Sequence, residues 1–315
     1  MKIAVILDPL ESIKPYKDTS YAIMREAAKR GHSLHVLMQE DLILREGIVF
    51  GLAHRLKLTE DPLMWYHIDP VETIPLREFD AVLMRKDPPF DMEYIYSTYL
   101  LELAQNQGTY IFNNPCAIRD YNEKMAIAKF PEFTTPTMVS RNANEVRQFI
   151  EQHDDCILKP LDGMGGSNIF RVTPRDVNLN VILETFMHDN AQTIMAQRYI
   201  PEITKGDKRV LVIDGKPIPY ALARIPKPGE TRGNLARGGL GVAQPLSARD
   251  REIAETLGPK LKAEGLLLVG LDIIGDYLTE VNVTSPTCMR EIEDQTGFSA
   301  AALMVDALER LSQQP

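Results

Sequence analysis

The chain has 315 residues, enough for two or three domains that each bury a hydrophobic core. Its formal net charge of −9 argues against a broad nucleic-acid surface, which needs a basic face. Three cysteines without a Cys-x-x-Cys pair, no signal-peptide core and no apolar stretch of about 20 residues predict a reduced, cytoplasmic protein without a membrane span.

The amino-terminal part alternates short apolar runs with a helical pattern. Residues 3–7 and 34–38 have the composition of buried strands, and between them lies a helix that Asp18 caps. A strand–helix–strand opening of this kind predicts a parallel α/β domain. We expect no Rossmann cofactor site, because the first strand runs into Asp8 and Pro9 rather than into glycines.

A further buried strand over residues 79–84 runs into a basic loop. Arg85 and Lys86 follow the strand directly, and two prolines stiffen the loop behind them. Ligands of open α/β sheets gather at the carboxyl ends of strands, so these residues suggest an anion site. An ordinary solvated loop is an equally good interpretation at this stage.

We place a domain boundary at residue 120, which divides the chain into residues 1–120 and 121–315. Asn114 and Pro115 begin a new segment, in which we expect a helix over residues 116–129. That helix would contain Lys124.

The stretch from Ile157 to Val172 joins an apolar run that ends in Lys159 to a glycine-rich turn and a return strand. Backbone N–H groups in such a turn form a concavity for phosphate oxygens, and the lysine adds a positive charge beside it. The stretch is not a Walker A loop, and Asn168 stands where a dinucleotide fingerprint needs its third glycine. An ordinary β-hairpin with glycines in its turn is the alternative.

Residues 226–241 carry the strongest loop signal in the chain, with two prolines and five glycines interleaved with Arg232 and Arg237. The hairpin before it carries Arg209 and Arg224. Arginines on a mobile glycine-rich flap suggest a lid that closes over anions and excludes water. A disordered surface loop is the competing interpretation.

Residues 269–283 form two apolar strands that polar residues interrupt. Glu280 and Asn282 are two residues apart, so they share one face of their strand. If the turn has the odd length 275–277, Asp272 lies opposite Glu280 on that face, whereas a two-residue turn places it on the other face. Two carboxylates and an amide oxygen that converge in a sheet need a cation, and such a set suits Mg²⁺ completed by water and phosphate.

These motifs together resemble the ATP-grasp carboxylate–amine ligases, and more closely the bacterial type of glutathione synthetase. The residues that carry the resemblance are Lys124, Lys159 and the stretches 84–90, 158–166 and 270–287. It covers nearly the whole chain. The implied fold is α/β and α+β, with an amino-terminal parallel α/β domain before an ATP-grasp unit that holds its nucleotide between two antiparallel sheets.

The resemblance implies ATP-dependent ligation of γ-glutamylcysteine to glycine through an acyl phosphate, with release of ADP and phosphate. A carboxylate is a poor acyl donor until it is phosphorylated, and that transfer needs charge neutralisation more than acid–base help. The implied cofactors are ATP and Mg²⁺, with Mn²⁺ as a substitute. The implied partners are these small-molecule substrates and further copies of the chain, as a dimer or tetramer, with no nucleic acid and no membrane.

The resemblance also implies roles for individual residues. The nucleotide set is Lys124, Lys159, Gly163, Gly165, Gly166, Ser167, Gln197, Tyr199, Ile200 and Asp207. The metal set is Asp272, Glu280 and Asn282. The set that faces the γ-phosphate and the acyl phosphate is Arg209, Arg224 and Arg232, with Arg237 as a second candidate on the flap. The substrate-anchoring set is Arg85, Ser285 and Arg290.

Gln197 departs from the pattern of many ATP-grasp relatives, which carry an acidic residue there. We therefore expect the backbone of residues 197–200 to cradle the adenine, with Asp207 near the ribose. The six histidines are scattered over strand and loop positions, and we assign them no catalytic role.

Two alternatives stay open. One is another ATP-grasp ligase, such as a D-alanine–D-alanine ligase or a glutamate-adding ligase. The Arg85 loop argues against it, because a dipeptide with two carboxylates needs more cationic anchoring than a single alanine. The other is a sensor that binds ATP without turnover, against which the full metal set of Asp272, Glu280 and Asn282 argues.

Overall fold

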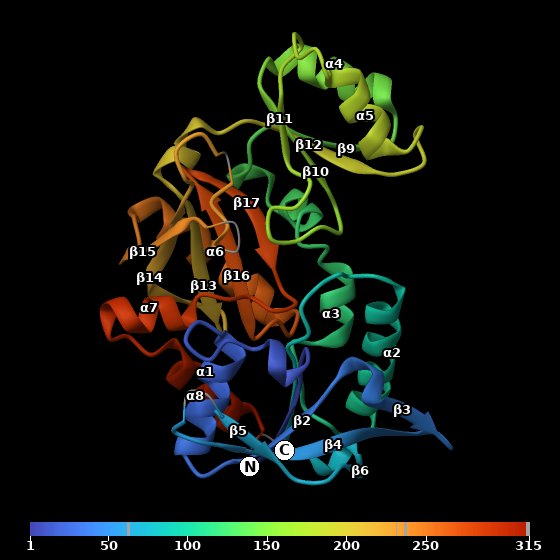
Figure 1. Ribbon diagram of the computed structural model, residues 1–315, viewed down its shortest axis with the longest axis vertical. Coiled ribbons are helices and arrows are strands. Elements are labelled where there is room, and N and C mark those ends of the chain that lie inside the picture. The colour runs from blue at the N-terminus through green and yellow to red at the C-terminus, as the bar shows by residue number, and fades with distance from the viewer. Residues whose placement is uncertain (62–63, 231, 236–237, 313–315) are drawn as a thin grey trace.

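The computed structural model describes residues 1–61, 64–230, 232–235 and 238–312. The amino-terminal unit is built on a mixed sheet at the bottom of Figure 1. Its strands β2, β1, β7 and β8 run parallel in that order, over Ser33–Leu37, Lys2–Ile6, Ala81–Met84 and Ile111–Phe112. Strand β4 (Ile48–Leu58) pairs antiparallel with β2, and three strands pair with β4, namely β3 (Leu42–Arg45), β5 (Tyr66–Ile68) and β6 (Glu72–Pro75). The predicted parallel core is confirmed, and it carries an antiparallel extension at one edge.

Two helices of this unit begin where acidic residues cap them. Helix α1 (Thr19–Lys29) starts after Asp18, whose side chain accepts a hydrogen bond of 2.7 Å from the Tyr21 N–H. Helix α2 (Met92–Asn106) starts after Asp91, which accepts from the Tyr94 N–H at 2.9 Å. Each cap satisfies a backbone donor that the first helical turn leaves without a partner.

Two antiparallel sheets form the rest of the chain, as the resemblance predicts. The smaller one, in the upper lobe of Figure 1, has the order β11-β10-β12-β9, over Phe170–Val172, Cys156–Pro160, Ile194–Arg198 and Thr137–Ser140. Helices α4 (Ala143–His153) and α5 (Leu179–Met187) share its hydrophobic core. The larger sheet has the order β15-β14-β13-β16-β17, over Leu240–Pro245, Lys216–Ile225, Asp207–Ile213, Leu268–Ile274 and Tyr277–Asn282. Helix α6 (Ala248–Ala263) packs against it.

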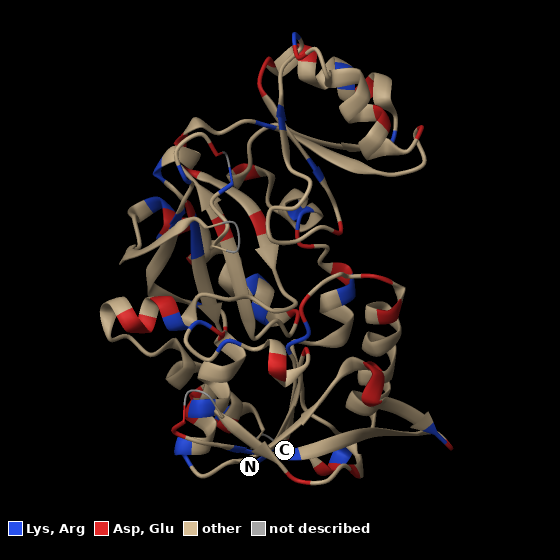
Figure 2. Ribbon diagram, viewed as in Figure 1, with Lys and Arg blue, Asp and Glu red and all other residues tan. Residues whose placement is uncertain are grey.

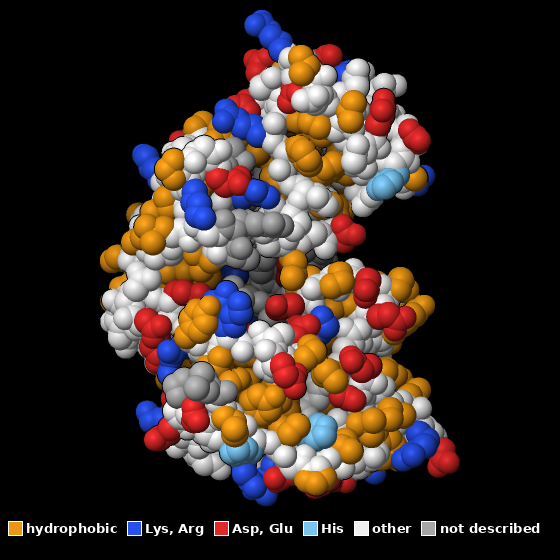
Figure 3. Space-filling model, in the orientation of Figure 1, with side chains coloured by type: hydrophobic (Ala, Val, Ile, Leu, Met, Phe, Trp, Pro, Cys, Tyr) orange, Lys and Arg blue, Asp and Glu red, His pale blue; other side chains and the backbone are white. Residues whose placement is uncertain are grey.

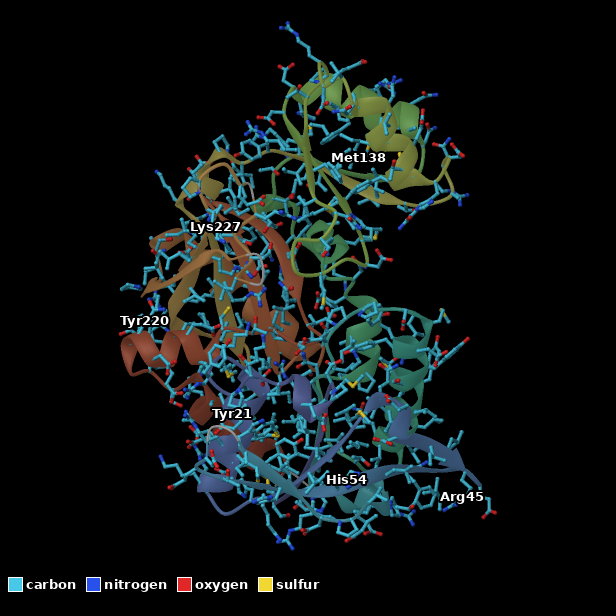
Figure 4. All side chains as sticks on the ribbon, viewed as in Figure 1. Tyr21, Arg45, His54, Met138, Tyr220 and Lys227 are labelled. Atoms are coloured by element: carbon cyan, nitrogen blue, oxygen red, sulfur yellow. The ribbon has the colours of Figure 1, made fainter. Side chains whose placement is uncertain are left out.

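The last two helices return to the amino-terminal unit. Helix α7 (Met289–Thr296) buries Met289, and helix α8 (Ala300–Leu311) buries Leu308, in the same core as Ile23 of α1. Among the residues labelled in Figure 4, Tyr21 lies in the amino-terminal unit, Tyr220 in the larger sheet and Met138 in the smaller one. Residues on both sides of position 120 therefore share one hydrophobic core. The division of the chain into domains at residue 120 stays a prediction.

The helix predicted over residues 116–129 is wrong. Helix α3 (Pro115–Asp120) ends early, and a 3-10 turn over residues 125–129 follows after a break. The side chain of Asn122 accepts hydrogen bonds from the N–H groups of Lys124 at 3.2 Å and Met125 at 3.0 Å. Short polar side chains compete with helical hydrogen bonding in this way, so the break places Lys124 at the entrance to a new turn rather than inside a helix.

The side chain of Asn113 ties the amino-terminal unit to the larger sheet. Its oxygen accepts from the N–H groups of Leu267 at 2.7 Å and Leu268 at 2.9 Å. Its amide nitrogen donates to the carbonyl oxygens of Leu268 at 2.8 Å and Val283 at 2.7 Å. This buried side chain connects the start of β16 to the segment after β17.

Replacing Asn113 by alanine is expected to lower the free energy of unfolding by about 3 kcal/mol, because four buried backbone groups lose their partner. Thermal unfolding of purified protein measures the effect as a fall in Tm of roughly 5–10 °C. Asn106→Ala, at the exposed end of α2, is the matched control and should leave Tm nearly unchanged. Equal shifts for the two variants would contradict the assignment of Asn113 as a tie between the two parts.

Charged residues of both signs are interspersed along the ribbon (Figure 2). Figure 3 shows the same mixture on one face of the molecule, which is hollowed between the lobe of the smaller sheet and the amino-terminal unit. Among the described residues, none of the helices combines the length and the apolar character that crossing a membrane requires.

Candidate active site

A cavity lies between the two antiparallel sheets, lined by residues of both. Strands β10 and β12 form one wall, and β13, β16 and β17 form the other. All ten residues of the predicted nucleotide set line this cavity, namely Lys124, Lys159, Gly163, Gly165, Gly166, Ser167, Gln197, Tyr199, Ile200 and Asp207. The structure thus brings together residues that lie up to 83 positions apart in the sequence.

Two buried lysines converge at one end of the cavity. The ammonium groups of Lys159 and Lys124 lie 3.8 Å and 3.9 Å from Oε1 of Glu280. Lys159 donates to the Thr279 carbonyl at 3.2 Å, and Lys124 donates to the Gly163 carbonyl. Burial lowers the pKa of Lys159, and the neighbouring Glu280 carboxylate opposes this effect. An anion that enters here meets positive charge from two different segments.

The glycine-rich turn between β10 and β11 lies against the flap. Gly165 and Gly166 have φ values of +61° and +73°, a backbone conformation that favours glycine. A Cβ on Gly166 would come within 2.3 Å of Oδ1 of Asn234, so the turn and the flap are in close contact. Arg232 donates to the Gly166 carbonyl at 3.3 Å and also lines the cavity. Arg237, the second flap candidate, lies outside the described residues.

The carboxylates of Asp272 and Glu280 lie opposite each other for a reason that the sequence did not reveal. The turn between β16 and β17 has two residues, because Ile274 pairs directly with Tyr277. A β-bulge then inserts Thr279 into β17, and its hydroxyl donates to the Asp272 carbonyl at 3.1 Å. The bulge shifts the register by one residue, so Asp272 pairs with Glu280 although the turn is even.

Asp272 is held by two buried arginines. Arg209 donates to both of its oxygens, at 2.5 Å and 3.1 Å, and Arg224 lies 2.8 Å from Oδ2. Burial alone would raise the pKa of Asp272, but the two guanidinium groups outweigh burial and hold that pKa well below its usual range. The cavity therefore keeps Asp272 ionised throughout the neutral pH range.

Asp207 has the opposite electrostatic behaviour. Arg224 donates to its Oδ2 at 2.5 Å, while no described residue hydrogen-bonds its buried Oδ1. Burial raises the pKa of Asp207 to about 7, with the carboxylates of Asp272 and Glu280 adding to the effect and Arg224 opposing it. Protonation of Asp207 therefore takes place near neutral pH.

A raised folded-state pKa gives a specific pH dependence of stability. The stabilisation from protonated Asp207 is complete below its ordinary pKa of 3.8 and is lost as the pH rises through about 7. Between about pH 5 and pH 8, the Tm of the wild type is expected to fall by roughly 5 °C relative to that of Asp207→Asn, which cannot ionise. Calorimetric scans across this range test the difference, and parallel curves for the two proteins would show that Asp207 does not titrate there.

The predicted metal set offers oxygen donors of the right chemistry. Asp272 and Glu280 line the cavity, and Asn282 donates its amide nitrogen to the Gly270 carbonyl at 3.1 Å, which leaves its oxygen as an acceptor. In the described part of the chain, no group of three or more His, Cys, Asp or Glu side chains could hold a metal ion by itself. Mg²⁺ is commonly held by one or two carboxylates together with substrate phosphates, and the residues present fit that kind of site.

The remaining predicted residues lie outside the cavity wall. Arg209 and Arg224 lie behind Asp272, and Asn282 lies beyond Glu280 along β17. Arg85 is buried and donates to the Ser20 hydroxyl at 3.0 Å and to the Pro286 carbonyl at 2.9 Å.

The other two substrate-anchoring candidates lie on different surfaces. Ser285 hydrogen-bonds Asp87 in the basic loop, and this contact opposes the rise that burial causes in the pKa of that carboxyl. Arg290 pairs with Glu293 at 3.3 Å and lines a separate open groove beside Trp65. Arg85 and Ser285 therefore both lie where the basic loop after β7 meets residues 285–286, and Arg290 lies apart from them.

The side chain of Glu123 is a further residue of the site that no sequence pattern indicates. Its carboxylate accepts from the Val283 N–H at 3.0 Å, from the Thr284 N–H at 3.1 Å and from the Thr284 hydroxyl at 2.8 Å. It thereby fixes the segment after β17 beside Lys124. Its partners lie about 160 positions away in the sequence, and no local pattern indicates such a contact.

Comparison with known proteins gives a consistent assignment. Residues 1–119 match the family described as prokaryotic glutathione synthetase, N-terminal domain, and residues 123–297 match the ATP-grasp domain of the same family. The chain is 62% identical over 313 residues to a glutathione synthetase from Nitrosomonas europaea, with 98% of each chain covered. It is 56% identical over 310 residues to one from Ralstonia nicotianae, with 98% of this chain and 96% of that protein covered.

Similarity to solved structures shows the fold alone. The D-cycloserine synthetase DcsG superposes with a TM-score of 0.70 at 15% sequence identity and covers 99% of this chain and all of its own. The ATP-grasp ligase PsnB with its precursor peptide PsnA2 and AMPPNP superposes with a TM-score of 0.65 at 18% identity, over 99% of each chain. The two-sheet architecture and the sequence matches agree, so this chain belongs to the prokaryotic glutathione synthetase family and is an ATP-dependent ligase that makes glutathione.

Proposed function

We propose that the cavity between the two antiparallel sheets is the site at which γ-glutamylcysteine is joined to glycine. A carboxylate oxygen of the dipeptide attacks the γ-phosphorus of ATP, ADP leaves, and an acyl phosphate forms. The glycine nitrogen then attacks the acyl carbon, and phosphate leaves with one of the original carboxylate oxygens. The observation that carries the proposal is the pair of buried lysines opposite two carboxylates across one cavity.

The residues of the chain supply mostly charge and position in this proposal. Lys124 and Lys159 hold phosphate oxygens, and the N–H groups of the turn at Gly165 and Gly166 add hydrogen bonds to them. The backbone of residues 197–200 cradles the adenine, with Asp207 near the ribose. These positions agree with the cavity lining.

Asp272, Glu280 and Asn282 would hold the divalent ion that the family uses, in our proposal Mg²⁺ with Mn²⁺ as a substitute. That ion would neutralise charge on the transferring phosphoryl group. Arg209 and Arg224 keep Asp272 ionised, and we assign them to the γ-phosphate and the acyl phosphate during turnover. Their contact with Asp272 supports a place next to the reacting group.

The flap and the basic loop complete the proposed site. Arg232 closes over the phosphates and helps to exclude water from the acyl phosphate, which hydrolysis would otherwise destroy. Arg85, Ser285 and Arg290 anchor the dipeptide. The homo-oligomer, as a dimer or tetramer, and the cytoplasmic location stay predictions, and sedimentation of the purified protein tests the first of them.

ADP release with ATP, Mg²⁺, γ-glutamylcysteine and glycine, each omitted in turn, tests the substrate assignment. The proposal expects turnover only when both γ-glutamylcysteine and glycine are present. Turnover with D-alanine alone would keep the fold and mechanism and overturn the substrate. ATP binding without turnover on any of these substrates would instead favour a sensor.

A further inference from the structure

The side chain of Gln197 faces the cavity from the middle of the smaller sheet. It is 4% exposed and shares a sheet face with Ile157 and Lys159, both of which line the same cavity. In the register of the sheet it pairs with Ile157 on one side and with Thr137 on the other. The apolar Ile157 offers no hydrogen bond, so Thr137 is the polar neighbour that can set the orientation of the Gln197 amide.

Donor and acceptor rules fix which way that amide points. The hydroxyl of Thr137 lies 2.9 Å from the Thr135 carbonyl oxygen, which can only accept, so the single hydroxyl proton is used there. The Thr137 oxygen is then left as an acceptor. It lies 3.0 Å from the amide nitrogen of Gln197, which donates to it. The other end of the amide, the Oε1 carbonyl oxygen, is therefore the group that remains for a ligand.

We propose that Thr137 fixes the Gln197 amide with its carbonyl oxygen available to the cavity, so that the site selects the 6-amino group of adenine over a purine carbonyl. This rests on the proposed function, in which the cavity binds ATP at residues 197–200. The new element is Thr137, whose hydroxyl sets which end of the Gln197 amide meets a base bound at residues 197–200. Thr137 is a positioning residue, because it acts only through Gln197.

The chemical logic is a matched or mismatched hydrogen bond. An amino group at position 6 donates to the Gln197 oxygen, whereas a carbonyl there brings two acceptors together and leaves both without a partner. A free glutamine amide could rotate by half a turn and present its NH₂ group instead. Thr137 prevents that rotation, since a rotated amide would place two acceptors against each other at Thr137.

The test compares ATP with ITP, whose base carries a carbonyl at position 6. Dissociation constants for both nucleotides are measured by titration calorimetry with Mg²⁺ on the full chain. Thr137→Val removes the hydroxyl at nearly constant volume, and the ratio of ATP to ITP affinity is expected to fall about tenfold. Thr137→Ser keeps the hydroxyl and should keep the ratio.

A double-mutant cycle shows whether Thr137 acts through Gln197. In a Gln197→Met background, Thr137→Val should leave the ratio unchanged, because no amide remains to be oriented. If Thr137→Val leaves the ratio of ATP to ITP affinity unchanged, whether or not both affinities fall, the inference is overturned and the proposed function stays intact. A wild-type chain that binds neither nucleotide would overturn both.

Discussion

Replacing Glu280 by glutamine is expected to lower kcat by roughly 10²–10³-fold while the fold stays intact, because in the proposed site the neutral amide would be a weaker ligand for the cation. The side chain is 21% exposed and faces the cavity, and the ammonium groups of Lys124 and Lys159 lie within 3.9 Å of its Oε1. Its shape is unchanged by the substitution, so packing is preserved. Steady-state rates of ADP release, measured beside Tm, separate the two effects.

Glu255→Gln is the matched control for this variant. Glu255 lies on the exposed face of α6 and pairs with Arg251 at 3.6 Å. Its side chain is 57% exposed. The control is expected to match the wild type in both rate and Tm, since surface ion pairs contribute little. If the Glu280→Gln enzyme has the kcat of the wild type, the assignment of Glu280 to the catalytic site is wrong.

Replacing Arg224 by methionine is expected to cost about 3–5 kcal/mol of folding free energy and most of the activity. Arg224 is 4% exposed and donates to Asp207 at 2.5 Å while it also pairs with Asp272 at 2.8 Å. Its removal leaves two buried carboxylates with less compensation, and the pKa of Asp207 should rise further as a result. The expected fall in Tm is roughly 10 °C.

Arg224→Lys distinguishes charge from geometry at this position. The lysine retains a positive charge but cannot span the oxygens of both Asp207 and Asp272 as the planar guanidinium does, so an intermediate Tm is expected. Arg251→Met, which removes an exposed arginine of α6, is the control for the loss of a cation. If Arg224→Met and Arg251→Met lower Tm equally, the buried network does not stabilise the fold.

Local signals in the sequence mark some of the residues that line the cavity, whereas the two-sheet architecture and the rest of the nucleotide set were predicted only through the resemblance to a family. Lys159 ends an apolar run, the glycines mark the turn after it, and Glu280 interrupts an apolar strand. These signals are short-range, so a single sequence carries them. The resemblance to a ligase family supplied the connection between them.

Pairings across the sheets could not be predicted in the same way. The bulge at Thr279 changes the cross-strand partner of Asp272, and no glycine or proline at that position indicates a bulge in the sequence. Helix α3 ends at Asp120 inside a sequence predicted to be helical up to residue 129, and Asn122 then hydrogen-bonds the backbone of the next turn. The contact between Thr137 and Gln197 depends on strand register, which is set by tertiary packing.

The central claim, that an acyl phosphate forms on the dipeptide carboxylate, is tested most directly by oxygen transfer. The enzyme is given γ-glutamylcysteine whose cysteinyl carboxylate carries ¹⁸O, together with ATP, Mg²⁺ and glycine, and the released phosphate is analysed by mass spectrometry. The account predicts that each phosphate carries one oxygen from the labelled carboxylate, because phosphate leaves with that oxygen when the amine attacks. Phosphate free of ¹⁸O, formed at the same rate as the peptide product, would contradict it.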